Sequence, residues 1–185
     1  MENRYLCRAK RKNWRELPKD QWWVEGYHVE LPVGSIAATI VANDEEVVCE
    51  DTESYIISIY TKQHSNYSPG FPLEVVECEQ YEIDFDTLCR CTGLKDKNGK
   101  LIWENDILMC HGNSEDLVKA VFGEFNVINA ETLEVIDRVI GWHYEVVPTD
   151  ALSKCEPFCF SMPLTEEYVK ICEMEVVDNP ELLEV

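Results

Sequence analysis

Apolar residues along this chain alternate with polar ones or gather in short runs, and few follow the spacing of an amphipathic helix. Two runs rich in β-branched and aromatic residues, 54–61 and 120–128, predict strands. Other runs of the same kind predict further strands at 22–29, 36–41, 73–77, 138–142 and 171–177. The pattern therefore predicts a mainly β chain.

A hairpin is the clearest local signal, and it centres on Asn98 and Gly99. A two-residue hairpin loop needs a positive φ at both central positions, which Asn tolerates and Gly adopts freely. Such a loop would place Lys97 opposite Lys100 on paired strands. The sequence thus predicts two antiparallel strands on either side of Asn98 and Gly99.

The segments on both sides of this hairpin also carry strand and turn signals. Cys89 and Cys91 alternate with Arg90, which predicts one buried and one exposed face. Downstream, polar residues 104–106 separate two apolar runs and predict a turn between strands. Asn105 is a second candidate for left-handed backbone.

Helix signals are short. Thr165, followed by two acidic residues, predicts the start of one helix. Its apolar stripe would consist of Tyr168, Val169 and Cys172. Asn179 before Pro180 predicts a second helix of about one turn.

The predicted architecture is a set of antiparallel hairpins that form a small Src-homology-3-like barrel, with an additional β lobe and short helices. A length of 185 residues predicts a single domain. Within residues 1–185, the two lobes would span about residues 1–80 and about residues 81–185, the latter being the barrel-like one.

The stretch from residue 92 to residue 108 resembles the YopX family of phage and prophage proteins. That family shows Thr-Gly-Leu-Lys-Asp-Lys-Asn-Gly-Lys and then an aromatic residue with Glu-Gly-Asp-Ile-Val; this chain has Asn105 in place of the Gly and Leu108 in place of the Val. Segments 6–10, 23–27, 83–87 and 175–183 are also similar to the family. The structural signature comprises Thr92, Gly93, Leu94, Asn98, Gly99, Trp103, Asn105, Asp106, Asn179 and Pro180.

The resemblance implies a mainly β fold and an origin in a phage or prophage. It also implies a non-catalytic interaction or regulatory protein. Residues 31–76 and 137–163 do not align with the family pattern.

Charge is distributed unevenly along the chain. The net charge is −20, yet residues 1–20 hold seven basic and three acidic side chains. The remaining residues hold 9 basic and 33 acidic side chains, a net charge of −24. Because duplex DNA binding depends on a basic face, the acidic body is not expected to bind duplex DNA directly. The basic cluster at residues 8–15 could contact RNA, lipid or an acidic partner, although a solvated turn, or a partner for the protein's own acidic surface, is the simpler interpretation.

Strong acidity suggests a second function, in which carboxylates imitate nucleic-acid phosphates and occupy a host DNA- or RNA-binding factor. A surface potential of this sign accelerates association with basic partners and weakens with salt. Retention of a basic host protein at low salt would favour this hypothesis.

Nine cysteines raise the question of a metal or catalytic site, but no C-x-x-C pair is present. The odd number of cysteines and the N-terminal sequence predict that the cysteines are free thiols in the reducing bacterial cytoplasm. On strands, such cysteines serve as small buried apolar residues. A zinc site could still use Cys89, Cys91, Cys110 and His111. A further alternative is a nucleophilic Cys110 or Cys155 with His111 or His143 as its base. The primary prediction is therefore no catalytic residue, no metal and no cofactor.

Adjacent tryptophans, Trp22 and Trp23, suggest an interface. If both lie on a strand, they point to opposite faces, so one of them is exposed or covers a partner. This predicts a protein partner from host or phage, or a homo-oligomer. No stretch approaches the roughly 20 apolar residues of a membrane span.

Overall fold

The structure is a computed structural model, and it describes residues 5–32, 52–63, 74–129, 131–148 and 160–177. The chain divides into two compact units, which meet in sequence between Cys89 and Arg90. The N-terminal unit comprises Tyr5–Cys89, and the C-terminal unit contains Arg90–Val185. The sequence placed its lobe boundary about nine residues earlier.

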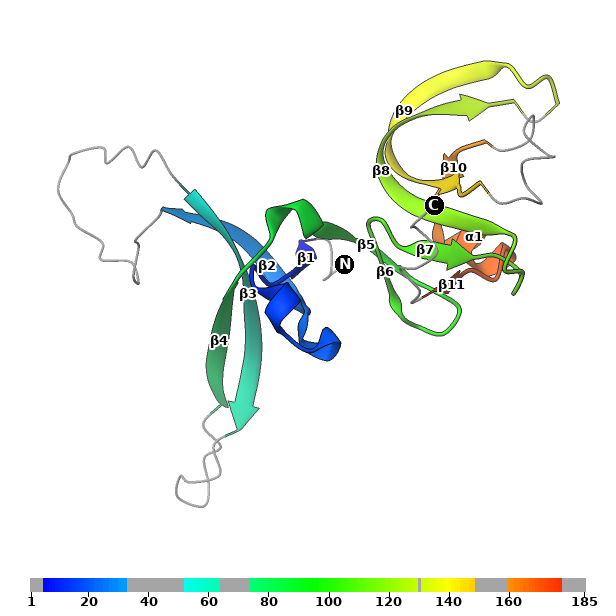
Figure 1. Cartoon of the computed structure of the whole chain (residues 1–185). Helices are drawn as coiled ribbons and strands as arrows, with labels where there is room; N and C mark the ends of the chain where they lie inside the picture. The colour runs from blue at the N-terminus through cyan, green and yellow to red at the C-terminus, as the bar shows by residue number, and fades with distance from the viewer. Residues whose placement is uncertain (1–4, 33–51, 64–73, 130, 149–159, 178–185) are drawn as a thin grey trace, which may run out of the picture. The chain divides into compact units, whose positions relative to one another are not determined.

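The N-terminal unit is built on four antiparallel strands in the order β4-β3-β2-β1 (Figure 1). The strands are β1 (Leu6–Lys10), β2 (Trp23–Pro32), β3 (Thr52–Gln63) and β4 (Glu74–Glu82). Three short 3₁₀ turns accompany them: η1 (Trp14–Glu16), η2 (Lys19–Gln21) and η3 (Phe85–Thr87).

The two faces of this sheet differ because side chains alternate along each strand. One face buries Ala9, Val24 and Ile56, and Ile83 joins them in the core. Cross-strand partners share a face, so the other face carries the pair Lys10 and Trp23 and the pair Tyr27 and Ile57. Of the residues on this second face, Trp23 and Tyr27 are 41% and 42% exposed.

Gly26 marks a close approach between β2 and β3. A Cβ atom at this position would lie 2.2 Å from the carbonyl oxygen of Ile57 and 2.7 Å from its carbonyl carbon. Because both atoms belong to the backbone, no side-chain movement could relieve the overlap. Glycine is therefore required here by packing.

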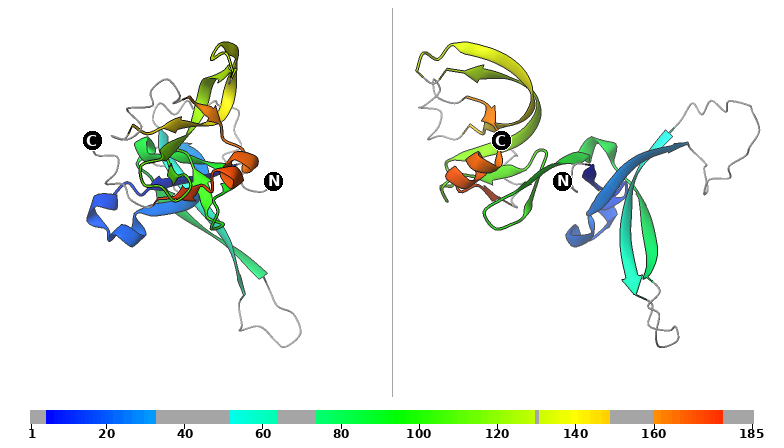
Figure 2. Two further views of the ribbon diagram at one scale, coloured as in Figure 1. Left: turned by 90° about the vertical axis from the view of Figure 1, so that its right-hand side faces the viewer. Right: turned by 180° about the vertical axis from the view of Figure 1, so that it is seen from behind.

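The C-terminal unit contains a five-stranded antiparallel sheet in the order β10-β9-β8-β7-β11 and a hairpin of β5 and β6. Its elements are β5 (Cys89–Lys95), of which only the first residue belongs to the N-terminal unit, β6 (Leu101–Trp103), β7 (Ile107–Met109), β8 (Leu117–Ile128), β9 (Val135–Val146), β10 (Met162–Pro163), α1 (Glu166–Ile171) and β11 (Glu175–Val176). Figures 1 and 2 show β8 and β9 as a long, strongly curved ribbon.

The core of the C-terminal unit collects residues from nearly all of these elements. Ile102, Leu108, Ala120, Val169 and Met174 are almost fully buried within one cluster. Burial of one helix side against the sheet explains why so short a helix is stable, since most helical stability in proteins comes from packing.

The strand and turn predictions are largely confirmed. The predicted strands 54–61, 120–128 and 138–142 lie inside β3, β8 and β9, and residues 74–77 of the predicted strand 73–77 belong to β4. Residues 36–41 and the predicted helix at Asn179 lie outside the described residues.

One predicted strand, 171–177, is wrong. Ile171 is the last residue of α1, and only Glu175–Val176 is extended and paired. The reason is that α1 packs Val169 into the core and continues through Ile171. At its start, the Thr165 hydroxyl accepts a 3.2 Å hydrogen bond from the Tyr168 N–H and caps the helix. The predicted start of this helix is confirmed, and the helix continues into the predicted strand.

The mainly β class is confirmed, but among the described strands no barrel closes. A barrel requires its two edge strands to pair with each other. In the five-stranded sheet the edges are β10 and β11, each two residues long and each paired with one inner neighbour. The described strands therefore form open sheets rather than the expected Src-homology-3-like barrel.

Candidate functional site

The signature hairpin joins β5 to β6 through a longer loop than the sequence predicted. The Gly99 N–H donates to the carbonyl of Asp96 at 3.0 Å, and the Asp96 N–H donates to the carbonyl of Lys100 at 2.8 Å. Gly99 has a φ of 84°, whereas Asn98 is not among the described residues with positive φ. The loop is thus a three-residue turn with a left-handed glycine at its end. The predicted pairing of Lys97 with Lys100 is wrong, because Asp96 faces Lys100.

Asp96 organises this turn through its buried carboxylate. One carboxylate oxygen accepts the N–H groups of Asn98 at 2.9 Å and Lys100 at 2.8 Å. The other accepts the N–H of Val176 in β11 at 3.0 Å. Sequence reasoning missed this role, although Asp two residues before Asn-Gly is a recognised turn-forming arrangement.

The remaining described signature residues also shape the backbone. The Thr92 hydroxyl donates to the carbonyl of Ile102 at 2.8 Å, and Gly93 has a φ of 79°. Asn105 has a φ of 68°, which confirms the left-handed prediction. Its neighbour Asp106 accepts the Trp103 N–H at 2.9 Å. The signature residues between 92 and 106 therefore stabilise the backbone of the hairpin and of the turn that follows it.

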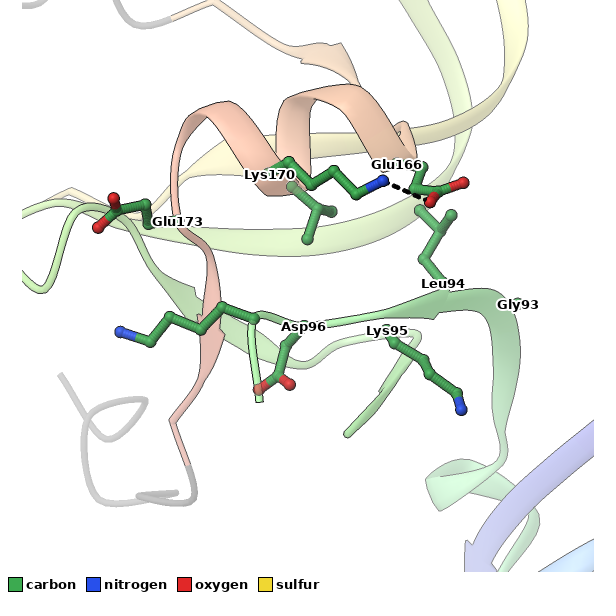
Figure 3. A pocket seen from close by; sticks show the side chains of 9 residues that line it. Gly93, Leu94, Lys95, Asp96, Glu166, Lys170 and Glu173 are labelled. Carbon is green, nitrogen blue, oxygen red and sulfur yellow. Dashed lines mark hydrogen bonds and ion pairs between the residues drawn. The ribbon is translucent and has the colours of Figure 1, made fainter. Parts of the chain in front are cut away.

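A hollow of about 570 Å³ lies between this hairpin and α1. Figure 3 shows Leu94 beneath the ion pair of Glu166 and Lys170. The complete lining is Gly93, Leu94, Lys95, Asp96, Lys97, Glu166, Val169, Lys170 and Glu173. None of these nine residues is a Ser, Cys or His, so the lining contains no nucleophile with an adjacent imidazole base.

The four candidate zinc ligands are not assembled into a metal site. Cys89, Cys91 and Cys110 are buried, and His111 is exposed with a φ of 53°. Within the described parts of the chain, no three His, Cys, Asp or Glu side chains are arranged to hold a metal ion.

The candidate nucleophile Cys110 lies in an environment that disfavours a thiolate. Burial, together with the nearby Asp116 and Cys172, raises the pKa of the Cys110 thiol from 9.0 to about 12. Its candidate base His143 is buried and stacked on Phe125, with ring centroids 4.7 Å apart. Cys155, the other candidate, lies outside the described residues.

Basic and aromatic side chains gather in the N-terminal unit, where the sequence singled out only Trp22, Trp23 and a basic cluster. The Lys10 Nζ lies 4.0, 5.2 and 5.4 Å from the ring centroids of Trp14, Trp22 and Trp23. Three further cations lie over the same rings: Arg8 over Trp23 at 5.0 Å, Arg15 over Trp14 at 4.4 Å and Lys19 over Trp22 at 5.9 Å. We call these seven residues the cation–aromatic surface.

The connection between β1 and β2 holds this surface in place. The Arg11 N–H donates to the Trp22 carbonyl at 2.9 Å and closes the connection. The indole N–H of Trp22 donates to the Leu17 carbonyl at 2.8 Å, and that of Trp14 donates to Asp84 at 3.1 Å. The two rings meet edge to face at 4.8 Å. Fixed rings of this kind present their faces to cations without further loss of side-chain freedom.

Trp22 does not begin the strand as the sequence predicted. It lies at the end of η2, and β2 begins at Trp23. The two adjacent rings therefore belong to different elements, and Trp22 is half-buried while Trp23 is exposed.

Ion pairing distinguishes Lys12 from Lys10, Arg15 and Lys19. Lys12 is paired with Glu82 and Glu53, and the pKa of its ammonium is raised chiefly by the hydrogen bond to Glu82. With respect to the described carboxylates, Lys10, Arg15 and Lys19 form no ion pair. These three cations face tryptophan rings instead, in a chain that has 36 acidic and 16 basic side chains.

Comparison with known proteins connects most of the chain to one family. The family model described as YopX protein matches residues 40–184. The similarities noted at residues 6–10 and 23–27 precede this match. No curated protein and no solved structure matches the chain. Among the described helices, none has the length and apolarity needed to cross a bilayer.

Proposed function

We propose, since this chain belongs to the YopX family, that it is a non-catalytic binding protein of phage or prophage origin acting in the bacterial cytoplasm. Its partner would be anionic and would bind to the cation–aromatic surface of the N-terminal unit. The observation that carries the proposal is that Lys10, Arg15 and Lys19 face aromatic rings and form no ion pair with a described carboxylate.

An incoming anion is attracted by cations whose charge is not already neutralised by a carboxylate. A cation paired with a carboxylate offers little net potential, whereas a cation over a ring keeps most of its charge available. The body of the chain carries a net charge of −24, so an anion would gain energy chiefly at cations outside the body that form no ion pair with a described carboxylate. Arg15 and Lys19 are exposed and therefore reachable.

The direct test measures binding of simple polyanions by the full chain at low salt. The probes are a polyglutamate peptide, heparin and a single-stranded oligonucleotide, and binding is followed by tryptophan fluorescence. We expect at least one probe to bind, and we expect the double variant Arg15→Gln, Lys19→Gln to bind it more weakly, with a smaller salt dependence.

A matched control changes a cation of the C-terminal unit. Lys170→Gln removes an exposed charge that is paired with Glu166 at 2.7 Å, and it should leave binding unchanged. Absence of binding for all three polyanions, or equal binding by the double variant, would overturn the proposal.

The acidic-mimic hypothesis stays a prediction with a separate test. If the carboxylates of the body imitate nucleic acid, the chain should retain a basic DNA-binding protein at low salt and release it as salt is added. That retention should not depend on Arg15 or Lys19, which distinguishes it from the proposed function.

A further inference from the structure

We infer that the exposed face of the N-terminal sheet binds single-stranded nucleic acid, with bases stacked on Trp23 and Tyr27 and phosphates held by Arg8 and Lys10. This inference rests on the proposed function and specifies the anionic partner. It adds Tyr27 to the cation–aromatic surface as a second stacking ring.

The geometry of β2 supplies the platform. Trp23 and Tyr27 are four residues apart on one strand, so their side chains share a face and are separated by about 13 Å along it. Their side chains are 41% and 42% exposed, although both are large aromatic residues. Exposed rings on an open sheet are the arrangement on which successive bases of a single strand stack.

The neighbouring strand β1 places cations beside these rings. Lys10 pairs across the strands with Trp23, and Arg8 pairs with Glu25, the residue midway between the two rings. The Arg8 guanidinium also lies 5.0 Å from the Trp23 ring centroid. Trp23 and its neighbouring cations can therefore accept a base on the aromatic face and a phosphate next to it, and Tyr27 offers a second ring further along the strand.

Other anionic partners fit this face less well. An acidic peptide has carboxylates for the cations but no planar groups for Trp23 and Tyr27. Duplex DNA keeps its bases stacked inside the helix, and its denser charge would be repelled by the acidic body. A single strand satisfies both the cations and the rings.

Carboxylates on this face oppose the inference. The register places Glu53 and Glu82 here, both paired with Lys12. Nearest to the rings, and between them along the strand, is Glu25. Its carboxylate is exposed and lies on the same face as both rings, next to the expected path of the phosphates. We therefore expect it to weaken binding, and its replacement by the uncharged Gln should strengthen binding several-fold. A partner held by hydrogen bonds to Glu25 would show the opposite response.

The experiment measures the affinity of the full chain for a labelled oligothymidylate and oligouridylate of about 12 nucleotides by fluorescence anisotropy. The variants are Trp23→Ala, Tyr27→Ala and Glu25→Gln. Because stacking of one base is worth about 1–3 kcal/mol, each ring deletion should weaken binding by about 5- to 150-fold. Tryptophan quenching by the oligonucleotide should shrink in Trp23→Ala.

A matched control deletes another exposed ring of the same unit. Phe85 is 54% exposed, and its ring centroid lies 5.8 Å from that of His28, which faces the other side of the sheet. Phe85→Ala should leave the affinity unchanged. Circular dichroism of each variant checks that the sheet is intact. If Trp23→Ala unfolds the sheet, the affinities of Tyr27→Ala and Glu25→Gln, which alter exposed side chains, still test whether this face binds the oligonucleotide.

The outcomes separate the two proposals. Weaker binding in the ring variants and tighter binding in Glu25→Gln support the inference. Binding of polyglutamate but not of the oligonucleotides, with loss in the double variant Arg15→Gln, Lys19→Gln, overturns the inference and leaves the proposed function standing. Equal oligonucleotide affinity in wild type and all ring variants also overturns the inference, and failure of every polyanion overturns both.

Discussion

Replacement of Asp96 by Ala should destabilise the C-terminal unit, because this one carboxylate satisfies three backbone N–H groups. Two belong to the hairpin turn, Asn98 and Lys100, and the third belongs to Val176 of β11. Asp96 itself is only 6% exposed. Removing it takes away the acceptor for all three donors at once.

The size of the effect follows from the number of bonds and their exposure. A hydrogen bond to a charged group contributes about 1.5–3 kcal/mol, but water can reach the donors of an exposed turn and recover part of the loss. The Val176 donor is only partly exposed and recovers less. We therefore expect Asp96→Ala to lower the free energy of unfolding of the C-terminal unit by about 3 kcal/mol.

Hydrogen exchange is the suitable assay, since the two units need not unfold together. Amides of Leu108 and Ala120 in the buried cluster should exchange about a hundredfold faster in Asp96→Ala, and amides of the N-terminal sheet should not change. Asp96→Asn keeps one oxygen as an acceptor and should lose about 1–2 kcal/mol. Asp86→Ala, which removes an exposed carboxylate with no hydrogen bond to a described residue, serves as the charge control. A change below about 0.5 kcal/mol in Asp96→Ala would refute this reasoning.

Three further predictions concern other parts of the chain. Gly26→Ala should lower the stability of the N-terminal unit by about 1–3 kcal/mol or more, measured by urea denaturation, because its Cβ would meet the Ile57 backbone; Gly141→Ala, with nothing within 4 Å of the new Cβ, should be near neutral. Thr165→Ala should cost about 1 kcal/mol in the C-terminal unit through the lost cap, and Thr165→Ser should restore most of it. Because folding raises the pKa of Cys110 from 9.0 to about 12, the folded unit binds this proton more tightly than the unfolded chain; its contribution is fully present below pH 9 and is lost as the pH rises toward 12. The urea midpoint should therefore fall above pH 9, and a Cys110→Ala variant should fall less; equal pH dependence of the two proteins would contradict the assignment.

Much of the local structure was predictable from the sequence because it depends on nearby residues. The strand β8 follows from its run of β-branched and aromatic residues, and Asn105 follows from its position between two apolar runs. The alternation of Cys89, Arg90 and Cys91 gave their burial correctly. In each case the deciding information lies within a few residues.

The sequence-based predictions are wrong where a side chain or a contact with a distant part of the chain determines the local structure. The hairpin loop lengthens because the Asp96 carboxylate, rather than the Asn98 backbone, satisfies the turn. Ile171 is helical because α1 packs its Val169 into the core and continues past the predicted boundary. The cation–aromatic surface needs β1, η1, η2 and β2 together, so sequence reasoning found the basic cluster and the two tryptophans as separate features.

The hydrogen bond between Asp96 and Val176 cannot form early in translation, because it joins residues that are 80 positions apart. At about 5–20 residues per second, a ribosome needs about 4–16 s to travel between them. During that interval the turn lacks its β11 contacts, and the exposed edge of β7 has no partner from the C-terminal segment. Nascent C-terminal units should therefore be open to chaperones and proteases until residue 176 has emerged from the ribosome.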